Sequence, residues 1–265
     1  MSAKNSNALT ALVTGAAQGI GYELSRLFAQ DGYRLILIAR REEKLKETAA
    51  ALEKEFSVEV KIVLKDLSRP QAAQEIYNQL KEENILVDVL VNNAGYGLHN
   101  AFYENTLADE LSMIDLNIVS LVEMAKLFGA DMVERGHGKI LNIGSIAAYK
   151  PGPFSAIYYG TKAFVVKFSE ALAGELQGTG VSVSVLCPGP TRTGFQRRSG
   201  SVGNKAAEMN MMPADVVAKI GYAAFKKGQV IIIPGLKNKV MALMFRFLPV
   251  SWSLSLVRTV QKTIK

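Results

Sequence analysis

The sequence predicts a single α/β domain, a doubly wound parallel sheet of seven strands with helices on both faces. Apolar runs of strand length alternate with longer segments of helical period, which is typical of repeated strand-helix-strand units. The 265 residues are 49% hydrophobic and 21% charged, which is enough for one large core. Because no repeat, linker or low-complexity tract interrupts the alternation, we assign residues 1–265 to one domain.

Each predicted strand is a short aliphatic or β-branched run, and each predicted helix is a longer segment with helical periodicity. The predicted strands are residues 8–13, 34–39, 59–64, 87–91, 139–143, 181–186 and 230–233. The clearest helices are residues 42–56, 71–83, 107–134, 154–177 and 214–227. Residues 196–212 form the long irregular segment, which we expect to be a substrate loop. A basic, apolar and helical C-terminal extension follows at residues 236–265.

The first strand runs into a glycine-rich turn, Thr14–Gly21, and a helix follows. Glycines at such a turn let the backbone approach a pyrophosphate, which the amides and dipole at the helix N-terminus then stabilise. The spacing of Gly15, Gly19 and Gly21 is not the common Gly-x-Gly-x-x-Gly, and three glycines could also form a plain turn. The turn therefore indicates a dinucleotide site only in combination with other motifs.

The end of the second strand bears on which dinucleotide would bind. Ala39 is followed by Arg40 and Arg41, about twenty residues beyond the turn, where NAD-binding proteins place an acid on the ribose 2′-hydroxyl. Guanidinium groups suit a 2′-phosphate instead, which a carboxylate would repel. The pair therefore predicts NADP(H), and we also expect at least one arginine to pair with Glu42 or Glu43.

A candidate catalytic group begins where the fifth strand ends. Ser145 follows that strand, Tyr158 comes thirteen residues later, and Lys162 lies four beyond the tyrosine. Residues four apart share one face of a helix, so the ammonium would lower the phenol pKa from ~10 toward neutrality. Ser145 would supply a neutral hydrogen-bond donor to the same substrate oxygen.

The same Tyr-x-x-x-Lys spacing occurs twice more, at Tyr77 with Lys81 and at Tyr222 with Lys226. Neither pair has a hydrogen-bonding side chain thirteen residues upstream. We interpret both as ordinary pairs on the surface of a helix.

Polar groups also end the fourth and sixth predicted strands, Asn92–Gly95 and Cys187–Thr193, at the sheet edge where α/β proteins bind ligands. Asn117 lies in the middle of the predicted helix 107–134. Asparagine is unfavourable inside a helix unless its side chain has another role. These groups extend the candidate site beyond the Tyr158 helix.

The formal net charge of +7 is unevenly distributed. Asp215 is the last acidic residue, so residues 216–265 carry nine Lys or Arg and no carboxylate. No apolar run approaches the ~20 residues that span a bilayer, and we expect no signal peptide. The single cysteine, Cys187, ends a β-branched run, so we expect a buried, inert thiol and a reducing, cytoplasmic setting. We expect no metal site and no nucleic-acid partner.

Taken in chain order, these motifs resemble the motif series of the short-chain dehydrogenase/reductase family over residues 8 to about 195. The resemblance implies a Rossmann-type fold and reversible hydride transfer between NADP(H) and a carbonyl or secondary alcohol. From about Gly235 onward the chain is only weakly similar to a bacterial branch of the family with mixed or unknown substrates. The motifs that match are Thr14–Gly21, Asn92–Gly95, Asn117, Ser145, Tyr158 with Lys162, and Pro188–Thr193.

The resemblance also implies a role for each site residue. Tyr158 would donate the proton to the carbonyl oxygen, and Ser145 would hydrogen-bond that oxygen. Lys162 would lower the tyrosine pKa and bind the nicotinamide ribose, while Asn117 would hold a water in the proton relay. The implied cofactor contacts are Gly15, Ala17, Gln18, Gly19, Ile20, Gly21, Arg40, Arg41, Asp66 at the adenine, Leu67, Asn93, Ala94, Gly95, Tyr158, Lys162, Pro188, Gly189, Thr191 and Thr193. Thr191 stands where the family more often has a branched aliphatic residue.

The substrate pocket is expected between the loops near residues 98–103, 147–155 and 195–212. Its aromatic residues suggest an apolar pocket, and they are Phe102, Tyr103, Tyr149 and Phe154. The substrate stays open between a small ketone or aldehyde, a steroid-like alcohol and a 3-oxoacyl thioester. A non-catalytic NADP-binding regulator is the alternative from another class, and the intact set of four catalytic residues disfavours it. We further expect a homo-oligomer.

The C-terminal extension allows more than one interpretation. Trp252, Leu256, Val260 and Ile264 recur every four residues, which predicts an apolar stripe on a final helix, although the alternation at residues 251–256 also fits a strand. The segment could pack against its own domain or a second subunit and close the substrate pocket. It could also hold the protein at an anionic membrane surface as a peripheral protein, or dock an acidic acyl carrier.

Overall fold

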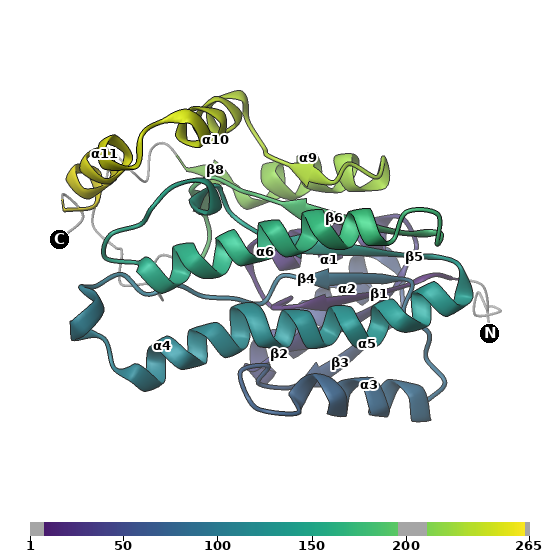
Figure 1. The fold of residues 1–265 in the computed structure, drawn as a ribbon. Coiled ribbons are helices and arrows are strands. Elements are labelled where there is room, and N and C mark those ends of the chain that lie inside the picture. Colours follow the sequence, from purple (N-terminus) through teal and green to yellow (C-terminus); the bar gives the residue numbers. More distant parts are fainter. Residues whose placement is uncertain (1–7, 196–210, 263–265) are drawn as a thin grey trace.

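The computed structural model describes residues 8–195 and 211–262, and within them the chain forms the predicted doubly wound sheet. Seven parallel strands lie in the order β3-β2-β1-β4-β5-β6-β9 (Figure 1). They are β1 (Thr10–Thr14), β2 (Arg34–Ala39), β3 (Val60–Leu64), β4 (Val89–Asn92), β5 (Gly138–Ile143), β6 (Val181–Leu186) and β9 (Ile231–Ile232). The order reverses between β1 and β4, and ligands bind beside the carboxyl ends of the strands at such a point.

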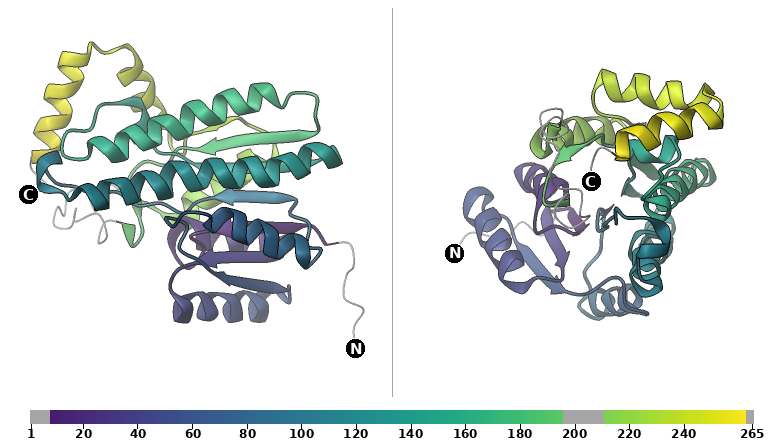
Figure 2. Two further views of the ribbon diagram at one scale, coloured as in Figure 1. Left: turned by 60° about the horizontal axis from the view of Figure 1, so that its bottom comes forward. Right: turned by 90° about the vertical axis from the view of Figure 1, so that its left-hand side faces the viewer.

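Helices cover both faces of the sheet because its strands alternate between two apolar faces (Figures 1 and 2). In β1, for example, Ala11 and Val13 belong to one buried cluster and Leu12 belongs to the other. The first cluster lies under α1 (Gly19–Gln30), α2 (Glu42–Phe56) and α9 (Ala214–Lys226). The second face is covered by α3 (Ala72–Glu82), α5 (Ser120–Arg135) and α6 (Ala156–Glu175).

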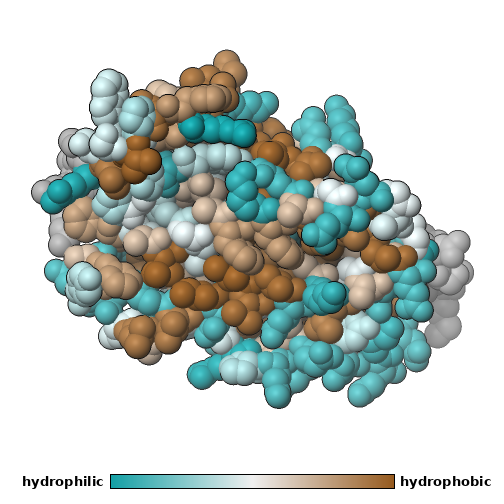
Figure 3. All heavy atoms as spheres, in the orientation of Figure 1, coloured by the Kyte–Doolittle hydropathy of each residue, from teal (hydrophilic) through white to brown (hydrophobic). Residues whose placement is uncertain are grey.

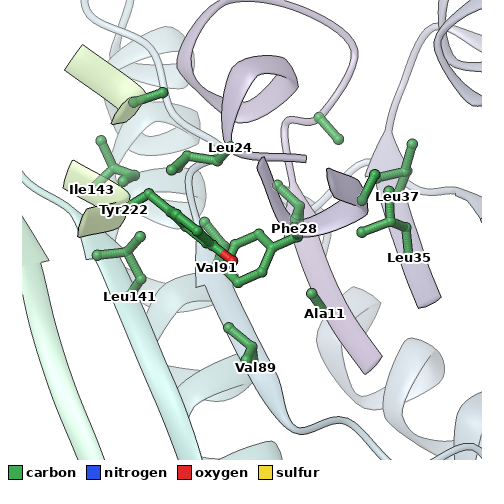
Figure 4. Close-up of a cluster of buried hydrophobic side chains, with 14 of the residues drawn as sticks. Ala11, Leu24, Phe28, Leu35, Leu37, Val89, Val91, Leu141, Ile143 and Tyr222 are labelled. Carbon is green, nitrogen blue, oxygen red and sulfur yellow. The ribbon is translucent and has the colours of Figure 1, made fainter. Parts of the chain in front are cut away.

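The centre of the first cluster is aromatic (Figure 4). The Phe28 ring meets Tyr222 edge to face at 4.8 Å, and it also contacts Tyr33 and Phe225. Tyr222 is buried, so the expectation of a surface position for this residue is wrong. Its ring fills the space between α1 and α9, and only its hydroxyl reaches the surface carboxylate of Asp31.

The predicted helix 107–134 is interrupted. It divides into α4 (Leu107–Ile114), a π-helical turn η2 (Asp115–Val119) and α5, with Asn117 buried inside the π-helical turn. A π-turn adds one residue to the helical repeat and is frequent at functional sites. The physical reason for the break is the Asn117 amide, which hydrogen-bonds the backbone of Tyr96 instead of facing water.

Short elements complete the carboxyl edge of the sheet. They are η1 (Phe102–Glu104), η3 (Ile146–Tyr149) and a two-stranded parallel pair, β7 (Thr191–Arg192) with β8 (Met212–Pro213). Of the predicted substrate loop, residues 196–210 lie outside the described part of the chain.

The C-terminal extension forms two helices, α10 (Leu236–Phe247) and α11 (Val250–Lys262), at the outside of the molecule beyond β9 (Figures 1 and 2). Sequence periodicity predicted the second helix but not the first. In α11 the side chains of Ser253 and Val257 are buried, whereas Trp252 is exposed. Trp252, the first residue of the predicted stripe, therefore does not pack against the domain. Ile264, the last residue of that stripe, lies outside the described residues. Among the described residues, no helix is long and apolar enough to cross a membrane.

Candidate active site

The glycine turn is fastened to the end of β4 by a set of hydrogen bonds. The Thr14 hydroxyl accepts from the amides of Asn93 and Ala94, both at 2.9 Å. The Asn93 side-chain amide donates to the carbonyls of Thr14 at 2.8 Å and Gly15 at 3.1 Å. Gly15 has a φ of +65°, and a Cβ there would lie 2.8 Å from the Asn93 amide nitrogen. Glycine is therefore required by both backbone conformation and space.

A cavity of about 760 Å³ extends along the carboxyl ends of the strands from this turn to the segment after β6. Ser145 lines this cavity, as do all of the predicted cofactor contacts except Gly21 and Asp66. Gly21 lies behind the turn, where a Cβ would collide with the Asn93 side chain. The Asp66 carboxylate faces its own loop, because it accepts hydrogen bonds from the hydroxyl of Ser68 at 2.7 Å and the amide of Ser68 at 3.1 Å.

Arg40 and Arg41 line the cavity and are exposed. Arg40 Nη1 is 3.5 Å from Asp66 Oδ2, a long contact, and Arg41 Nη2 donates to Gln18 Oε1 at 2.8 Å. The expected pairing with Glu42 or Glu43 is wrong within the described residues, since Glu42 pairs with Lys46 on its own helix. Within the described residues Arg41 forms no ion pair, and such a guanidinium can bind a phosphate.

Tyr158 and Ser145 both line the cavity. Ser145 follows β5 and accepts a hydrogen bond from the amide of Ala147, while Tyr158 projects from the first turn of α6. Burial raises the pKa of Tyr158 to about 12, and the hydrogen bond with the Ser145 side chain acts in the opposite direction. The phenol is therefore protonated at neutral pH, the state that can donate a proton.

Lys162 lies one helical turn beyond Tyr158 and is buried. Its ammonium donates to the Ile143 carbonyl at 2.8 Å, and its Nζ is 6.0 Å from the centre of the Tyr158 ring. Burial lowers the pKa of Lys162 to about 8. The expected lowering of the Tyr158 pKa by this lysine is wrong for this arrangement, because burial of the phenol dominates and the ammonium binds a backbone carbonyl.

Asn117 stands one layer behind the cavity lining. Its side-chain oxygen accepts from the Tyr96 amide at 3.1 Å, and its nitrogen donates to the Tyr96 carbonyl at 2.9 Å and to Thr161 Oγ1 at 3.1 Å. A Cβ at Gly95 would lie 2.9 Å from Asn117 Oδ1 and 3.7 Å from Lys162 Nζ. The sequence-predicted Asn117 and Lys162 therefore approach the same backbone position.

A buried polar chain that sequence reasoning missed holds α6 against the sheet. The Asn92 amide donates to Asn142 Oδ1 at 3.0 Å, the Asn142 amide donates to Ser169 Oγ at 2.9 Å, and Ser169 Oγ donates to the Val165 carbonyl. Two asparagines at equivalent positions of neighbouring strands were the available signal, because a buried amide needs a partner. The chain fixes the helix that carries Tyr158 and Lys162.

Aromatic rings line the cavity, but they are not the predicted ones. Of the predicted aromatic residues, Tyr103 is fully exposed, Phe102 is about half exposed, and neither Tyr149 nor Phe154 lines the cavity. The rings that do line it, with the polar side chains beside them, are Tyr96, Tyr158, Tyr159, Phe195, His99 and Lys150.

Two glycines explain why these rings line the cavity. A Cβ at Gly152 would overlap the Tyr159 ring, and one at Gly97 would come within 3.0 Å of the Tyr158 ring and 3.1 Å of the Phe195 ring. Small residues at these positions let the rings reach the cavity. Cys187 is buried as predicted, and burial raises the pKa of its thiol to about 12, so it is inert.

Comparison with known proteins agrees with this geometry. The sequence profile of the short chain dehydrogenase family matches residues 9–202, and the chain belongs to this family. It is 40% identical over 186 residues to sulfoacetaldehyde reductase 2 of Chromohalobacter salexigens, covering 69% of this chain and 73% of that protein. It is 30% identical over 261 residues to the very-long-chain 3-oxoacyl-CoA reductase of Anas platyrhynchos, covering 96% and 80% of the two chains.

A solved structure also resembles the fold. A short-chain dehydrogenase from Sphingobium yanoikuyae in complex with NADPH superimposes with a TM-score of 0.81 at 32% identity, covering 89% of this chain and 92% of that one. The chain is accordingly an oxidoreductase of the short-chain dehydrogenase family with a Rossmann-type fold. Across residues 8–195 and 211–262, no group of three or more His, Cys, Asp or Glu is placed to hold a metal ion.

Proposed function

We propose that this protein transfers a hydride between NADP(H) and a carbonyl or secondary alcohol, with Tyr158 as the general acid and base. The observation that carries the proposal is the hydrogen-bonded pair of Ser145 and protonated Tyr158 in a cavity whose other end is a glycine turn beside two arginines. The turn at Gly15 lines the cavity with backbone and no side chain, which suits a pyrophosphate, and the solved relative is in complex with NADPH. When bound, NADPH supplies the hydride.

The residues of this chain would act on the carbonyl oxygen. The Ser145 hydroxyl and the Tyr158 phenol both donate hydrogen bonds to that oxygen, which polarises the carbonyl, and Tyr158 then releases its proton to the forming alkoxide. The Lys162 ammonium, which lines the cavity one helical turn beyond Tyr158, would hold the nicotinamide ribose. Asn117 keeps a water near Lys162 for reprotonation, which is supported by the approach of both side chains to Gly95.

The test is a panel of carbonyl compounds, with oxidation of NADPH followed at saturating cofactor. We expect turnover with at least one ketone or aldehyde that fits an aromatic cavity, and slower turnover with NADH. Binding of NADPH without turnover of any carbonyl, and without oxidation of the corresponding alcohols by NADP, would instead support the non-catalytic regulator.

A reductase of 3-oxoacyl thioesters is a second candidate. A relative whose name states this reaction aligns with 96% of the present chain. The cavity also carries Lys150, and no carboxylate within the described residues forms an ion pair with it. Comparison of a 3-oxoacyl-CoA with a neutral ketone of the same chain length separates the candidates, because the thioester reductase should prefer the CoA compound.

The chain is also proposed to form a homo-oligomer through α5 and α6. Figure 3 shows hydrophobic side chains gathered over these helices, and Phe164 stacks on Phe168 at 5.7 Å while staying partly exposed. Charges of both signs border this surface, including the Lys167 and Glu170 pair, so two copies can meet without net repulsion. Sedimentation velocity of the wild type against Phe164→Glu tests it, with dissociation of the variant as the expected result.

A further inference from the structure

Helix α10 has two apolar faces, and only one of them is used by the domain. Ala242 and Phe245 are buried on the inner side. Leu236, Val240, Leu243 and Phe247 follow the spacing i, i+4, i+7, i+11, which places them in one stripe on the opposite side of the helix. These four residues, named here the outer α10 face, are 77%, 58%, 59% and 77% exposed.

The charges beside this stripe all have one sign. By the helical repeat, Lys237 lies on one flank of the outer α10 face, and Lys239 and Arg246 lie on the other. No acidic residue occurs anywhere in residues 216–265. An apolar stripe with lysine and arginine on both flanks is typical of a helix that lies in the plane of a membrane interface.

The same charges disfavour a second copy as the occupant. A two-fold symmetric contact would bring Lys237, Lys239 and Arg246 against their own copies with no carboxylate from this segment between them. The surface of α5 and α6, in contrast, carries both signs. An anionic surface complements the positive charge of the outer α10 face, whereas a second copy of the same face would repel it.

The inner side of α10 borders the active-site cavity. The Asn238 side chain occupies the space where a Cβ of Gly189 would lie, and Lys150 Nζ sits 5.4 Å from the centre of the Phe245 ring. Gly189 and Lys150 both line the cavity. A partner on the outer face would therefore lie one helix away from the substrate.

We propose that the outer α10 face binds the surface of an anionic phospholipid bilayer. The apolar stripe enters the interface between headgroups and acyl chains, and the flanking lysines and arginine contact lipid phosphates. Each such cation strengthens binding roughly fivefold, so the interaction weakens as salt rises. The proposal does not depend on the reaction that the cavity catalyses, because it concerns only this surface.

The test is co-sedimentation of the full chain with vesicles, either of equal parts phosphatidylglycerol and phosphatidylcholine or of phosphatidylcholine alone. We expect binding to the anionic vesicles at low salt and its loss at high salt. Leu243→Ser with Phe247→Ser should lower the partition at least about tenfold. The matched control is Phe102→Ser with Leu107→Ser, which also removes one exposed phenylalanine and one exposed leucine and should bind as the wild type does.

Other outcomes would overturn the proposal. These are no sedimentation with anionic vesicles at low salt, equal binding to both vesicle types at all salt concentrations, or equal loss in the two double variants. A dimer in sedimentation velocity that only the Leu243 and Phe247 variant abolishes would assign the face to a second copy. Binding of a purified acidic acyl carrier protein that depends on this pair, without vesicle binding, would assign it to that partner. Thermal unfolding of each variant checks that its fold is intact.

Discussion

Tyr158 with Lys162 in α6 and Tyr222 with Lys226 in α9 share one sequence spacing but have different partners. In α9, Asp31 Oδ2 accepts from both the Tyr222 hydroxyl and the Lys226 ammonium, each at 2.8 Å. Within the described residues no carboxylate bonds either member of the α6 pair. Tyr158 bonds the Ser145 side chain, and Lys162 bonds a backbone carbonyl.

The third pair repeats the α9 arrangement. Tyr77 donates to Asp131 Oδ1 at 2.8 Å, and Lys81 donates to Asp131 Oδ2 at 3.2 Å. In each of these two pairs one aspartate binds both the phenol hydroxyl and the ammonium. The partner of a Tyr-x-x-x-Lys pair, and not its spacing, therefore separates a structural clamp from a candidate proton donor.

The largest effect on kcat is expected from a change in the α6 pair. Tyr158→Phe removes the phenol hydroxyl that would protonate the carbonyl, so kcat should fall by at least ~10²-fold, the usual contribution of a positioned acid. NADPH affinity and the thermal midpoint should stay close to the wild type. Steady-state NADPH oxidation, fluorescence titration of NADPH and thermal unfolding measure the three quantities.

Tyr222→Phe is the matched control, since it removes the same hydroxyl from the pair clamped by Asp31. It should leave kcat unchanged and lower the free energy of unfolding by about 1 kcal/mol. Near-normal turnover in Tyr158→Phe, together with a large loss in Tyr159→Phe, would move the acid to the neighbouring tyrosine.

Arg40 extends the rule about partners to the nucleotide end of the cavity. Its ion pair with Asp66 is long, at 3.5 Å, and solvent-exposed, so we expect a 2′-phosphate to compete with this carboxylate for the guanidinium. Replacing Ala39→Asp with Arg40→Leu should reverse the preference from NADP(H) to NAD(H). Loss of charge-assisted hydrogen bonds worth ~1.5–3 kcal/mol corresponds to roughly 10- to 100-fold in kcat/KM for NADPH. Equal kcat/KM for both cofactors in the unmodified protein would contradict it.

The comparison also shows what could be predicted from the sequence. Strand and helix order followed from periodicity, and the candidate catalytic residues followed from spacing and motif order, because both are local properties. The partner that each donor finds is not local. Asp31 lies 191 residues from Tyr222, and no sequence pattern links them.

The same limit explains the errors in the pocket and the helices. Gly152 makes room for the Tyr159 ring, whereas the sequence favoured Phe102 and Tyr103, which the fold leaves exposed. The unfavourable position of Asn117 in a helix was a correct signal, because the residue lies in a π-helical turn and its amide bonds the backbone of Tyr96. In α11 the helix was predicted, but which face it buries depends on contacts with the domain.

An effect on stability, and not on turnover alone, is expected from the proton on Lys162. Its pKa in the folded chain is about 8, below the ordinary 10.5. Between those values the unfolded chain binds a proton that the folded chain has lost, so this residue's contribution to the free energy of unfolding rises with pH, by up to ~3 kcal/mol. Tyr158 acts oppositely at pH values between 10 and about 12, because its folded pKa is raised.

Lys162→Met should abolish this rise, and urea unfolding of both proteins from pH about 7 to about 10 measures it. The wild-type kcat/KM for carbonyl reduction should also decline above pH about 8 as the ammonium is lost. Lys162→Arg should shift that decline to higher pH, since guanidinium stays protonated. A stability difference between wild type and Lys162→Met that stays constant over this range would contradict the lowered pKa.

The smallest effect is expected at the carboxylate that defines the structural pair. The hydrogen bond from Lys226 lowers the pKa of Asp31 below its ordinary value, so the contribution of this carboxylate to stability is present at neutral pH and is lost as pH falls through the folded pKa. Asp31 is partly exposed, so Asp31→Asn should lower the free energy of unfolding by no more than ~1 kcal/mol at neutral pH. At pH about 3, urea unfolding should show a smaller difference between the wild type and Asp31→Asn.

Turnover should not depend on Asp31. Because Asp31 holds Tyr222 and Lys226 and neither lines the cavity, NADPH oxidation by Asp31→Asn should equal that of the wild type. A loss of turnover comparable to that of Tyr158→Phe would mean that an aspartate partner does not make a Tyr-x-x-x-Lys pair purely structural.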